Sequence, residues 1–370
     1  MSYLKQLTCL PFLLAASFML FYQVGLSQQK NTSLDGWLQD HVESLGGKAV
    51  LMIYKDGKIW YQQSVNETGG RKKMINRVAI KKMAKANPDL KNDFNEHSII
   101  PLASCSKWLS AALVMTFIDD GTLQLQDTIG HFLPVMTQHG KGNITIQQCL
   151  THTTGIYSNG LKENWELLKQ GNTMEAVANI IALREMEAKP GTAFHYGSIG
   201  LQIAGAILEK ITNKSYEQLF QERIAIPCQM RTASFGKNKV VLPAGGAKGS
   251  ATDYLRFTEM ILNKGTFQNK RVLSEKSIDA MQYNYIGELK MIHRPEQSGD
   301  FGYGFGEWTM TNASLTKKAM AVTSPGLFGT FPWVDYTKKY CAVLLSYNLQ
   351  SKGRHDIYTG LKKLVDSLLP

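Results

Sequence analysis

The sequence lacks the residue patterns that are typical of metal sites and of disulfide frameworks. It has five cysteines in 370 residues, and no Cys-x-x-Cys or His-x-His pattern occurs. Zinc therefore has no evident cluster of ligands, which argues against a metallo-hydrolase. Four of the cysteines follow the first 27 residues, at wide spacings and in apolar surroundings: Cys105, Cys149, Cys228 and Cys341. We expect these four side chains to be buried free thiols.

Internal repeats and a high content of charge are also absent. No segment recurs at a fixed period, which excludes solenoids and propellers. Charged residues make up 19% of the sequence, apolar residues 44% and aromatic residues 10%, which is typical of a folded globular protein. A chain of this length is expected to form one large domain or two intimately packed ones.

The excess of positive charge is confined to one stretch. Lys and Arg number 41 against 30 for Asp and Glu, a formal net charge of +11. Residues 71–85 hold much of this excess, and no acidic residue occurs between Glu67 and Asp89. The rest of the chain is close to balanced, so we expect no nucleic-acid partner. We expect residues 71–85 to be a solvated surface segment; the alternative is a weak contact with an anionic surface.

Only one apolar run is long enough to bear on localisation. Lys5 supplies a positive charge, an apolar run extends from Leu10 to Tyr22, and Gly25 and Ser27 are small residues before Gln28. This order is typical of a secretory signal peptide in residues 1–27 that is cleaved near Ser27. We therefore expect a secreted or periplasmic protein, with an uncleaved membrane anchor as the alternative.

The pattern of strands and helices predicts an α/β (α+β) fold. Residues 49–54 and 59–61 read as a β-hairpin around Asp56-Gly57, and residues 303–347 contain four further β-rich segments. Helices are expected over about 33–45 and 356–369, and residues 99–285 have helical periodicity. We predict an antiparallel sheet flanked by terminal helices, built from residues 28–98 and 300–370, with a large helical region, residues 99–299, inserted between its halves.

A candidate nucleophile lies where a β-like run gives way to a helix. Ser104-Cys105-Ser106-Lys107 is a Ser-x-x-Lys pattern, and its spacing of three places Ser104 and Lys107 on one helical face. A lysine amine in that position can help to remove the serine proton. Ser27/Lys30 and Ser314/Lys317 show the same spacing, but only Ser104 begins an apolar helix.

Two further segments carry candidate site residues. Tyr196 lies in a short loop, residues 190–198, directly before a helix with isoleucine every fourth residue. A tyrosine there can exchange a proton with a serine if neighbouring cations stabilise its phenolate; the alternative is a packing residue. Residues 324–329, Ser-Pro-Gly-Leu-Phe-Gly, follow a predicted strand, and their backbone N–H groups are suited to stabilising an oxyanion.

Together, in this order, the three segments resemble the serine β-lactamase and penicillin-binding-protein-like family, in its class C, DD-peptidase and esterase branch. The resemblance runs from about Ala49 to Asn348 and includes the secondary segments 118–123, 150–155, 245–250 and 303–306. It implies a β-lactamase/transpeptidase-like fold, Ser104 as nucleophile and Lys107 with Tyr196 as the proton-transfer pair. It also implies an oxyanion hole from the backbone N–H groups of Ser104 and Leu327, and no metal or organic cofactor.

The sequence departs from the family pattern at two candidate substrate-binding positions. Ser198 stands where the branch usually has Asn after Tyr-x, and Ser324 stands before Pro325-Gly326 where Lys or His is common. A cation there would attract a substrate carboxylate, so its loss argues against anionic substrates. No Ser-Asp-Asn supports a class A arrangement.

Two histidines invite a different mechanism. His152 suggests a triad with Ser104, but the sequence has no Gly-x-Ser-x-Gly elbow; His195 adjoins Tyr196 and could tune it. We expect structural roles for both.

The hypothesis that follows is a secreted serine hydrolase that cleaves an ester or amide of a small-molecule or cell-wall-derived substrate through an acyl-enzyme. Alternatives are a D-alanyl-D-alanine carboxypeptidase, a true β-lactamase, or a non-catalytic binding protein on the same fold.

Overall fold

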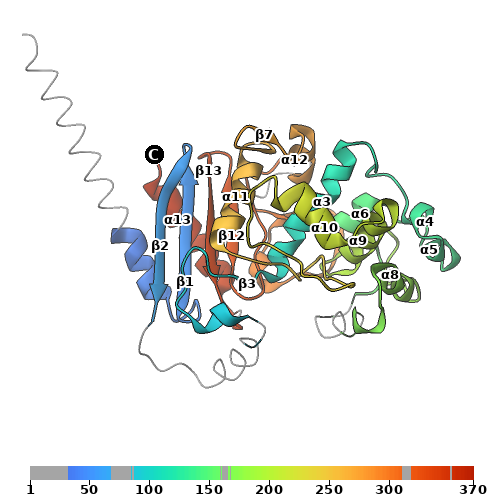
Figure 1. Ribbon diagram of the computed structural model, residues 1–370, viewed down its shortest axis with the longest axis horizontal. Coiled ribbons are helices and arrows are strands. Elements are labelled where there is room, and N and C mark those ends of the chain that lie inside the picture. Colours follow the sequence, from blue (N-terminus) through green and yellow to red (C-terminus); the bar gives the residue numbers. More distant parts are fainter. Residues whose placement is uncertain are drawn as a thin grey trace, which may run out of the picture.

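The computed structural model describes residues 32–67, 85, 87–158, 160, 166, 168–310, 318–350 and 352–370 (Figure 1). The predicted signal peptide and residues 71–84 of the basic stretch lie outside these residues. Within the described residues, no helix is both long and apolar enough to cross a membrane.

A seven-stranded antiparallel sheet forms one side of the molecule, with strands in the order β2-β1-β13-β12-β11-β10-β9. Its strands are β1 (Lys48–Lys55), β2 (Lys58–Asn66), β9 (Gly302–Tyr303), β10 (Trp308–Thr309), β11 (Ala321–Thr323), β12 (Phe331–Asp335) and β13 (Tyr340–Ser346). The N-terminal hairpin and the C-terminal strands therefore join through β1 and β13, as the sequence predicts. This pairing confirms that both ends of the chain contribute to one sheet.

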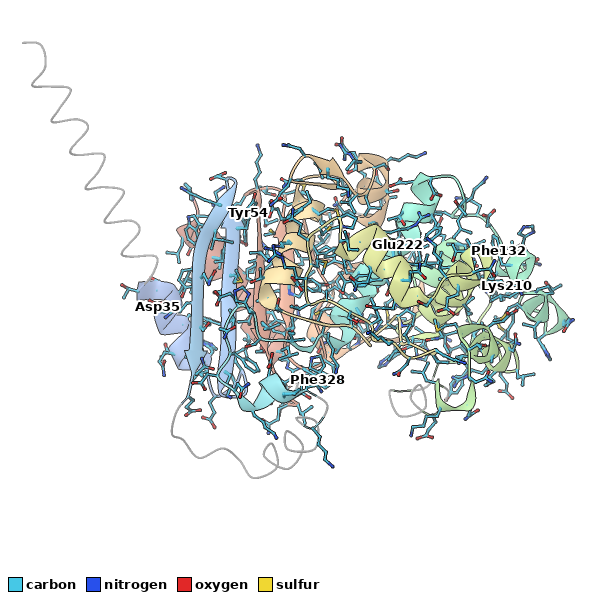
Figure 2. The ribbon with its side chains drawn as sticks, viewed as in Figure 1. Asp35, Tyr54, Phe132, Lys210, Glu222 and Phe328 are labelled. Atoms are coloured by element: carbon cyan, nitrogen blue, oxygen red, sulfur yellow. The ribbon has the colours of Figure 1, made fainter. Side chains whose placement is uncertain are left out.

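The two faces of the sheet are covered by different helices. Along β1, Leu51 and Ile53 pack in one hydrophobic cluster with the helix over residues 32–41 and with α13 (Arg354–Leu368). Val50 and Met52, which point to the opposite face, belong to a larger cluster that extends through the helical region. The alternation arises because successive side chains of a strand point to opposite faces. The terminal helices cover the outer face of the sheet. The helical region extends away from the sheet on the other side, so Phe132 in this region lies far from Tyr54 of β1 (Figure 2).

The helical region contains short strand pairs as well as helices. Its helices are α3 (Ser106–Asp119), α4 (Ile129–Phe132), α5 (Pro134–Gln138), α6 (Ile146–Leu150), α8 (Met174–Ala182), α9 (Ile199–Thr212), α10 (Tyr216–Phe220), α11 (Ala251–Leu262) and α12 (Glu275–Met281). Three two-stranded pairs lie among them: β3 (Ile100–Pro101) with β5 (Lys248–Gly249), β4 (Ala193–His195) with β8 (Lys290–His293), and β6 (Thr266–Phe267) with β7 (Lys270–Arg271). Helical periodicity did not reveal these pairs, because two to four residues are too few to show a period.

α3 lies in the interior of the helical region, where it packs against α9, α10 and α12, while α11 packs directly on β1, β12 and β13 of the sheet. Twelve of its residues, Ser106 to Phe117, are buried. The four cysteines are also buried and free, which confirms the expectation from the sequence.

Candidate active site

Ser104 lies in a tight turn between β3 and α3. Residues Ala103–Cys105 form a 3-10 turn, and α3 begins at Ser106. The sequence predicts Ser104 as the start of an α-helix, and the structure places it two residues earlier, in the tighter turn. Ala103 has a φ of +48°, which is rare for a residue with a side chain. This strained backbone positions the serine immediately before the N-terminal end of α3.

Lys107 is the nearest base to Ser104. Its Nζ lies 3.3 Å from Ser104 Oγ and donates to the Ala244 carbonyl at 2.8 Å. The side chain is buried, and among the described residues no carboxylate pairs with it. Burial lowers the pKa of Lys107 to about 7, because the charged form loses hydration that no counter-ion replaces. A neutral amine that can accept the serine proton is therefore well populated near neutral pH.

Tyr196 completes the group. The Lys107 Nζ lies 4.5 Å from the centre of its ring, and its hydroxyl is hydrogen-bonded with the Ser104 side chain and with Trp308. Burial raises the pKa of Tyr196 above its usual value, and this outweighs the lowering by the Ser104 hydrogen bond. The phenolate considered from the sequence is thus disfavoured, and Tyr196 is a neutral hydroxyl that can relay a proton.

Ser324 faces the protein interior. Its Oγ lies 3.0 Å from the Gly306 carbonyl and 3.3 Å from the Ser104 carbonyl, and its single proton is shared between these two acceptors. The residue is 2% exposed. Its hydroxyl therefore ties the end of β11 to the nucleophile turn and has no second proton to donate to a substrate.

Gly326 and Leu327 run beside the nucleophile turn. A Cβ at Gly326 would lie 2.6 Å from the Leu102 carbonyl oxygen, so only glycine permits this approach. The Leu327 carbonyl accepts from Arg354, the first residue of α13. The Gly326 contact places the residue next to Leu327 beside the turn that carries Ser104, which is compatible with the oxyanion hole that the family resemblance implies.

The remaining candidate residues surround Tyr196. Ser198 is buried at the N-cap of α9, two residues beyond the tyrosine. The Nε2 atom of His152 lies 3.0 Å from the Tyr303 hydroxyl, and its ring packs on Tyr196. His195 Nδ1 lies 2.7 Å from Glu187 Oε1. Within the described residues, the hydrogen-bond partners of these rings are Tyr303 and Glu187 and not Ser104, so neither histidine completes a triad with it.

The sequence did not indicate three residues that contact the candidate site around Ser104, Lys107 and Tyr196: Ala244, Trp308 and Arg354. Ala244 and Arg354 act through distant backbone contacts that no local pattern reveals. Trp308 bonds the tyrosine and follows the Tyr-Gly-Phe-Gly segment, so its position beside a family signature was the available signal. No group of three or more potential metal ligands occurs within the part of the chain that the structure describes.

Ser104, which is partly buried, thus lies beside a buried lysine without a counter-ion and a tyrosine hydroxyl, an arrangement suited to acyl transfer through a serine. The Beta-lactamase family model matches residues 34–365, so the chain belongs to the beta-lactamase family. Protein Rv1367c of Mycobacterium tuberculosis (strain ATCC 25618 / H37Rv) is 24% identical over 289 residues, which cover 64% of this chain and 72% of that protein.

Solved structures share the fold. A protein of Bacteroides dorei DSM 17855, provisionally described as a beta-lactamase, has a TM-score of 0.76 at 22% identity and covers 92% of this chain and 98% of its own. EstCE1, a hydrolase with promiscuous acyltransferase activity, has a TM-score of 0.70 at 18% identity and covers 93% and 99%. These likenesses confirm the β-lactamase/transpeptidase-like fold expected from the sequence.

Proposed function

We propose that this protein is a secreted serine hydrolase that cleaves uncharged esters or amides through an acyl-enzyme intermediate. The observation that carries the proposal is Lys107: a buried amine with a pKa of about 7, without a counter-ion, 3.3 Å from the Ser104 hydroxyl. Such an amine is suited to take the serine proton at neutral pH.

The reaction would proceed in two steps. Ser104 Oγ attacks the carbonyl carbon while its proton passes to Lys107, directly or through the Tyr196 hydroxyl. The carbonyl oxygen becomes an oxyanion, stabilised by the N–H groups of Ser104 and Leu327. When the tetrahedral intermediate collapses, the proton returns to the leaving oxygen or nitrogen, and the acyl group stays on Ser104. Water then attacks the ester with the same groups in the same roles, which releases the acid and restores the serine.

The preference for uncharged substrates rests on Ser324 and Ser198. Both are neutral, and the Ser324 hydroxyl is engaged by two carbonyls, so the position supplies no cation for a substrate carboxylate. EstCE1, a hydrolase with promiscuous acyltransferase activity, and a family VIII carboxylesterase share the fold, with TM-scores of 0.70 and 0.68, which supports an ester substrate. A D-alanyl-D-alanine carboxypeptidase or a true β-lactamase remains the second candidate, supported by the same Ser104–Lys107–Tyr196 group.

Intact-mass analysis tests the proposal. The mature protein is incubated with a fluorophosphonate and, separately, with a penicillin, and the modified peptide is mapped. We expect a fluorophosphonate adduct on Ser104 and none in Ser104→Ala. An adduct on another serine, or no adduct with either probe, would sink the acyl-enzyme mechanism and favour the non-catalytic binding protein. A stable penicillin adduct on Ser104 would support the second candidate.

Secretion is tested separately. N-terminal sequencing of material from outside the cytoplasm should begin near Gln28. Met1 retained in a membrane fraction would support an anchor.

A further inference from the structure

The contacts of Lys107 lead to a part of the molecule that is distant in sequence. Its ammonium group, once formed, has the Ala244 carbonyl at 2.8 Å as an acceptor. The titratable groups that act on Lys107 or respond to its charge are Cys105, His152 and Tyr196, and none is a carboxylate. The Ala244 carbonyl is therefore one of the groups whose position affects how well the charge on Lys107 is stabilised when it takes the serine proton.

The segment that carries this carbonyl, residues 241–247, is attached along α3. The Ser106 hydroxyl accepts the Ala247 N–H at 3.0 Å, and the Ser110 hydroxyl donates to the Pro243 carbonyl at 2.7 Å. These two serines flank Lys107 on the helix. Within the segment, the Leu242 carbonyl accepts from Gly245 and Gly246, which closes a tight turn around Ala244. A Cβ at Gly246 would lie 2.9 Å from the Leu242 carbonyl oxygen, so the turn favours glycine at that position.

Ser110 is itself oriented by a second residue. The Tyr216 hydroxyl of α10 donates to Ser110 Oγ at 2.6 Å, and both residues are 1% exposed. Burial raises the pKa of Tyr216, so its hydroxyl keeps its proton. A serine hydroxyl has one proton, and since Ser110 accepts from Tyr216, that proton is directed to Pro243. Gly205 of α9 leaves room for this arrangement, because a Cβ there would lie 3.0 Å from Pro243 Cγ and 3.2 Å from Tyr216 Cε2.

We propose that Ser110 and Tyr216 are positioning residues for Lys107, acting through the Pro243–Ala244 backbone. The inference rests on the proposed function, because it presumes that Lys107 takes up a proton during turnover. Pro243 and Ala244 are adjacent, so a hydrogen bond that fixes the first carbonyl also restricts the second. Loss of the Ser110 hydroxyl frees the segment and leaves the Tyr216 hydroxyl without its acceptor in the core. Small displacements of groups that act on reacting atoms are costly in rate.

The experiment compares Ser110→Ala and Tyr216→Phe with a matched control, Thr258→Val. Thr258 is fully buried and its hydroxyl donates to Leu255 at 2.9 Å within α11, away from residues 241–247. We measure kcat, KM and the pH profile with an uncharged p-nitrophenyl ester, and the melting temperature. Ser110→Ala is expected to lower kcat about tenfold or more with little change in KM. The acidic limb of its profile should move to lower pH, because a lysine that loses a carbonyl acceptor holds its proton less well.

The outcomes separate this proposal from a structural role and from the proposed function. Tyr216→Phe should shift kcat and the acidic limb in the same direction by a smaller amount, and Thr258→Val should shift neither. If Ser110→Ala loses kcat without a shift of the acidic limb, or matches Thr258→Val in both, the positioning role is wrong. If Ser110→Ala does not fold, Tyr216→Phe decides by the same two readouts. A wild-type protein that neither turns over the ester nor is labelled at Ser104 refutes the proposed function instead.

Discussion

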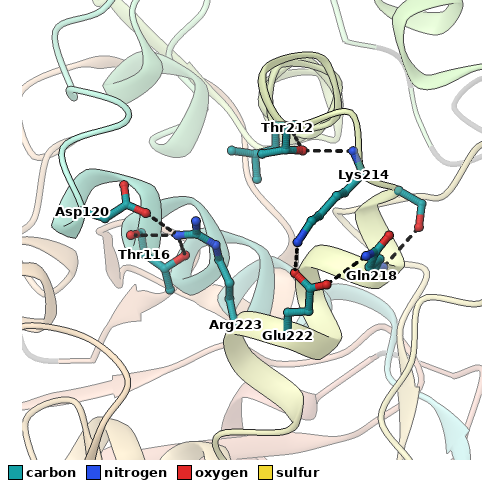
Figure 3. Close-up of polar contacts among 9 residues, drawn as sticks. Thr116, Asp120, Thr212, Lys214, Gln218, Glu222 and Arg223 are labelled. Atoms are coloured by element: carbon teal, nitrogen blue, oxygen red, sulfur yellow. Dashed lines mark hydrogen bonds and ion pairs between the residues drawn. The ribbon is translucent and has the colours of Figure 1, made fainter.

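The two ends of α3 differ in how a charged side chain is surrounded: one end has a buried lysine without a counter-ion, and the other has an ion pair that solvent reaches. At its N-terminal end, Lys107 is buried, and the described groups next to its Nζ are neutral: the Ser104 hydroxyl, the Ala244 carbonyl and the Tyr196 ring. At its C-terminal end, Asp120 pairs with Arg223 at 2.7 Å, and the guanidinium of Arg223 also donates to Thr116 (Figure 3). The side chains of this ion pair are 39% and 30% exposed.

The comparison shows what makes a charge chemically active. An ion pair that solvent reaches is screened and contributes little to stability, and its members stay charged. A buried ammonium without a counter-ion lies close in free energy to its neutral form, so it can exchange a proton at neutral pH. We call the end of α3 that carries the Asp120–Arg223 ion pair the structural end, and the end that carries Lys107 the reactive end.

Removing the Tyr196 hydroxyl should have the largest effect at the reactive end. Tyr196→Phe keeps the ring beside Lys107 but loses the bonds to Ser104 and Trp308. We expect kcat to fall by about 100- to 10,000-fold, which is typical of a general acid–base partner. Near-wild-type kcat, measured with the same ester and an unchanged melting temperature, would make Tyr196 a packing residue.

The pH dependence of turnover tests the pKa of Lys107. The neutral amine is the base, and its pKa is about 7, so kcat/KM should fall as pH decreases through 7. Below that value the neutral fraction, and with it the rate, should drop about tenfold per pH unit. Tyr196 stays protonated because its pKa is raised, so it should cause no loss of rate between pH 7 and 9. A rate that stays constant from pH 5 to 8, where circular dichroism shows an intact fold, would mean that Lys107 is not the base.

Introducing a cation at Ser324 should change substrate choice. Wild type should hydrolyse an uncharged p-nitrophenyl ester more efficiently than a chromogenic cephalosporin. Ser324→Lys should raise kcat/KM for the cephalosporin relative to kcat/KM for the ester by about tenfold to a hundredfold, which corresponds to the contribution of one charge-assisted hydrogen bond. Ser324→Ala is the matched control, since it loses the same hydroxyl and adds no charge. A strong preference of the wild type for the cephalosporin would show that another cation binds the carboxylate.

The smallest effect is expected at the structural end. Asp120→Asn removes the charge that pairs with Arg223, and the free energy of unfolding should fall by less than about 1 kcal/mol. Because this contact lies more than three helical turns from Lys107, kcat/KM should not change. A large loss of activity at full stability would show that the two ends of α3 are coupled.

The residues that sequence reasoning found share a local signature. Ser104 and Lys107 are three residues apart, and Tyr196 lies three residues before a periodic helix, so spacing and family resemblance were enough to select them as candidates. The sheet was also predictable, because its strands alternate or are continuously apolar.

The features that it missed depend on contacts across the fold. The direction of the Ser324 hydroxyl depends on β11 packing against the nucleophile turn, and the carbonyl of Ala244 depends on a tight turn seated on α3. Glu307 is a further example: it is fully buried, and burial raises its pKa well above the usual value. A sequence shows the identity of such a side chain but not its surroundings.

The four buried thiols give this molecule a built-in reporter of local opening. Burial raises the pKa of Cys149 and Cys228 to about 12, and the pKa values of Cys105 and Cys341 are also raised. The thiolate is the form of cysteine that attacks alkylating reagents, so the closed protein should be almost inert towards them. Each modification then reports a local unfolding event that exposed one cysteine to the reagent. Because Cys105 adjoins the nucleophile, Cys149 lies in α6 and Cys341 lies in β13, the relative alkylation rates would order the nucleophile turn, the helical region and the central sheet by how often each opens.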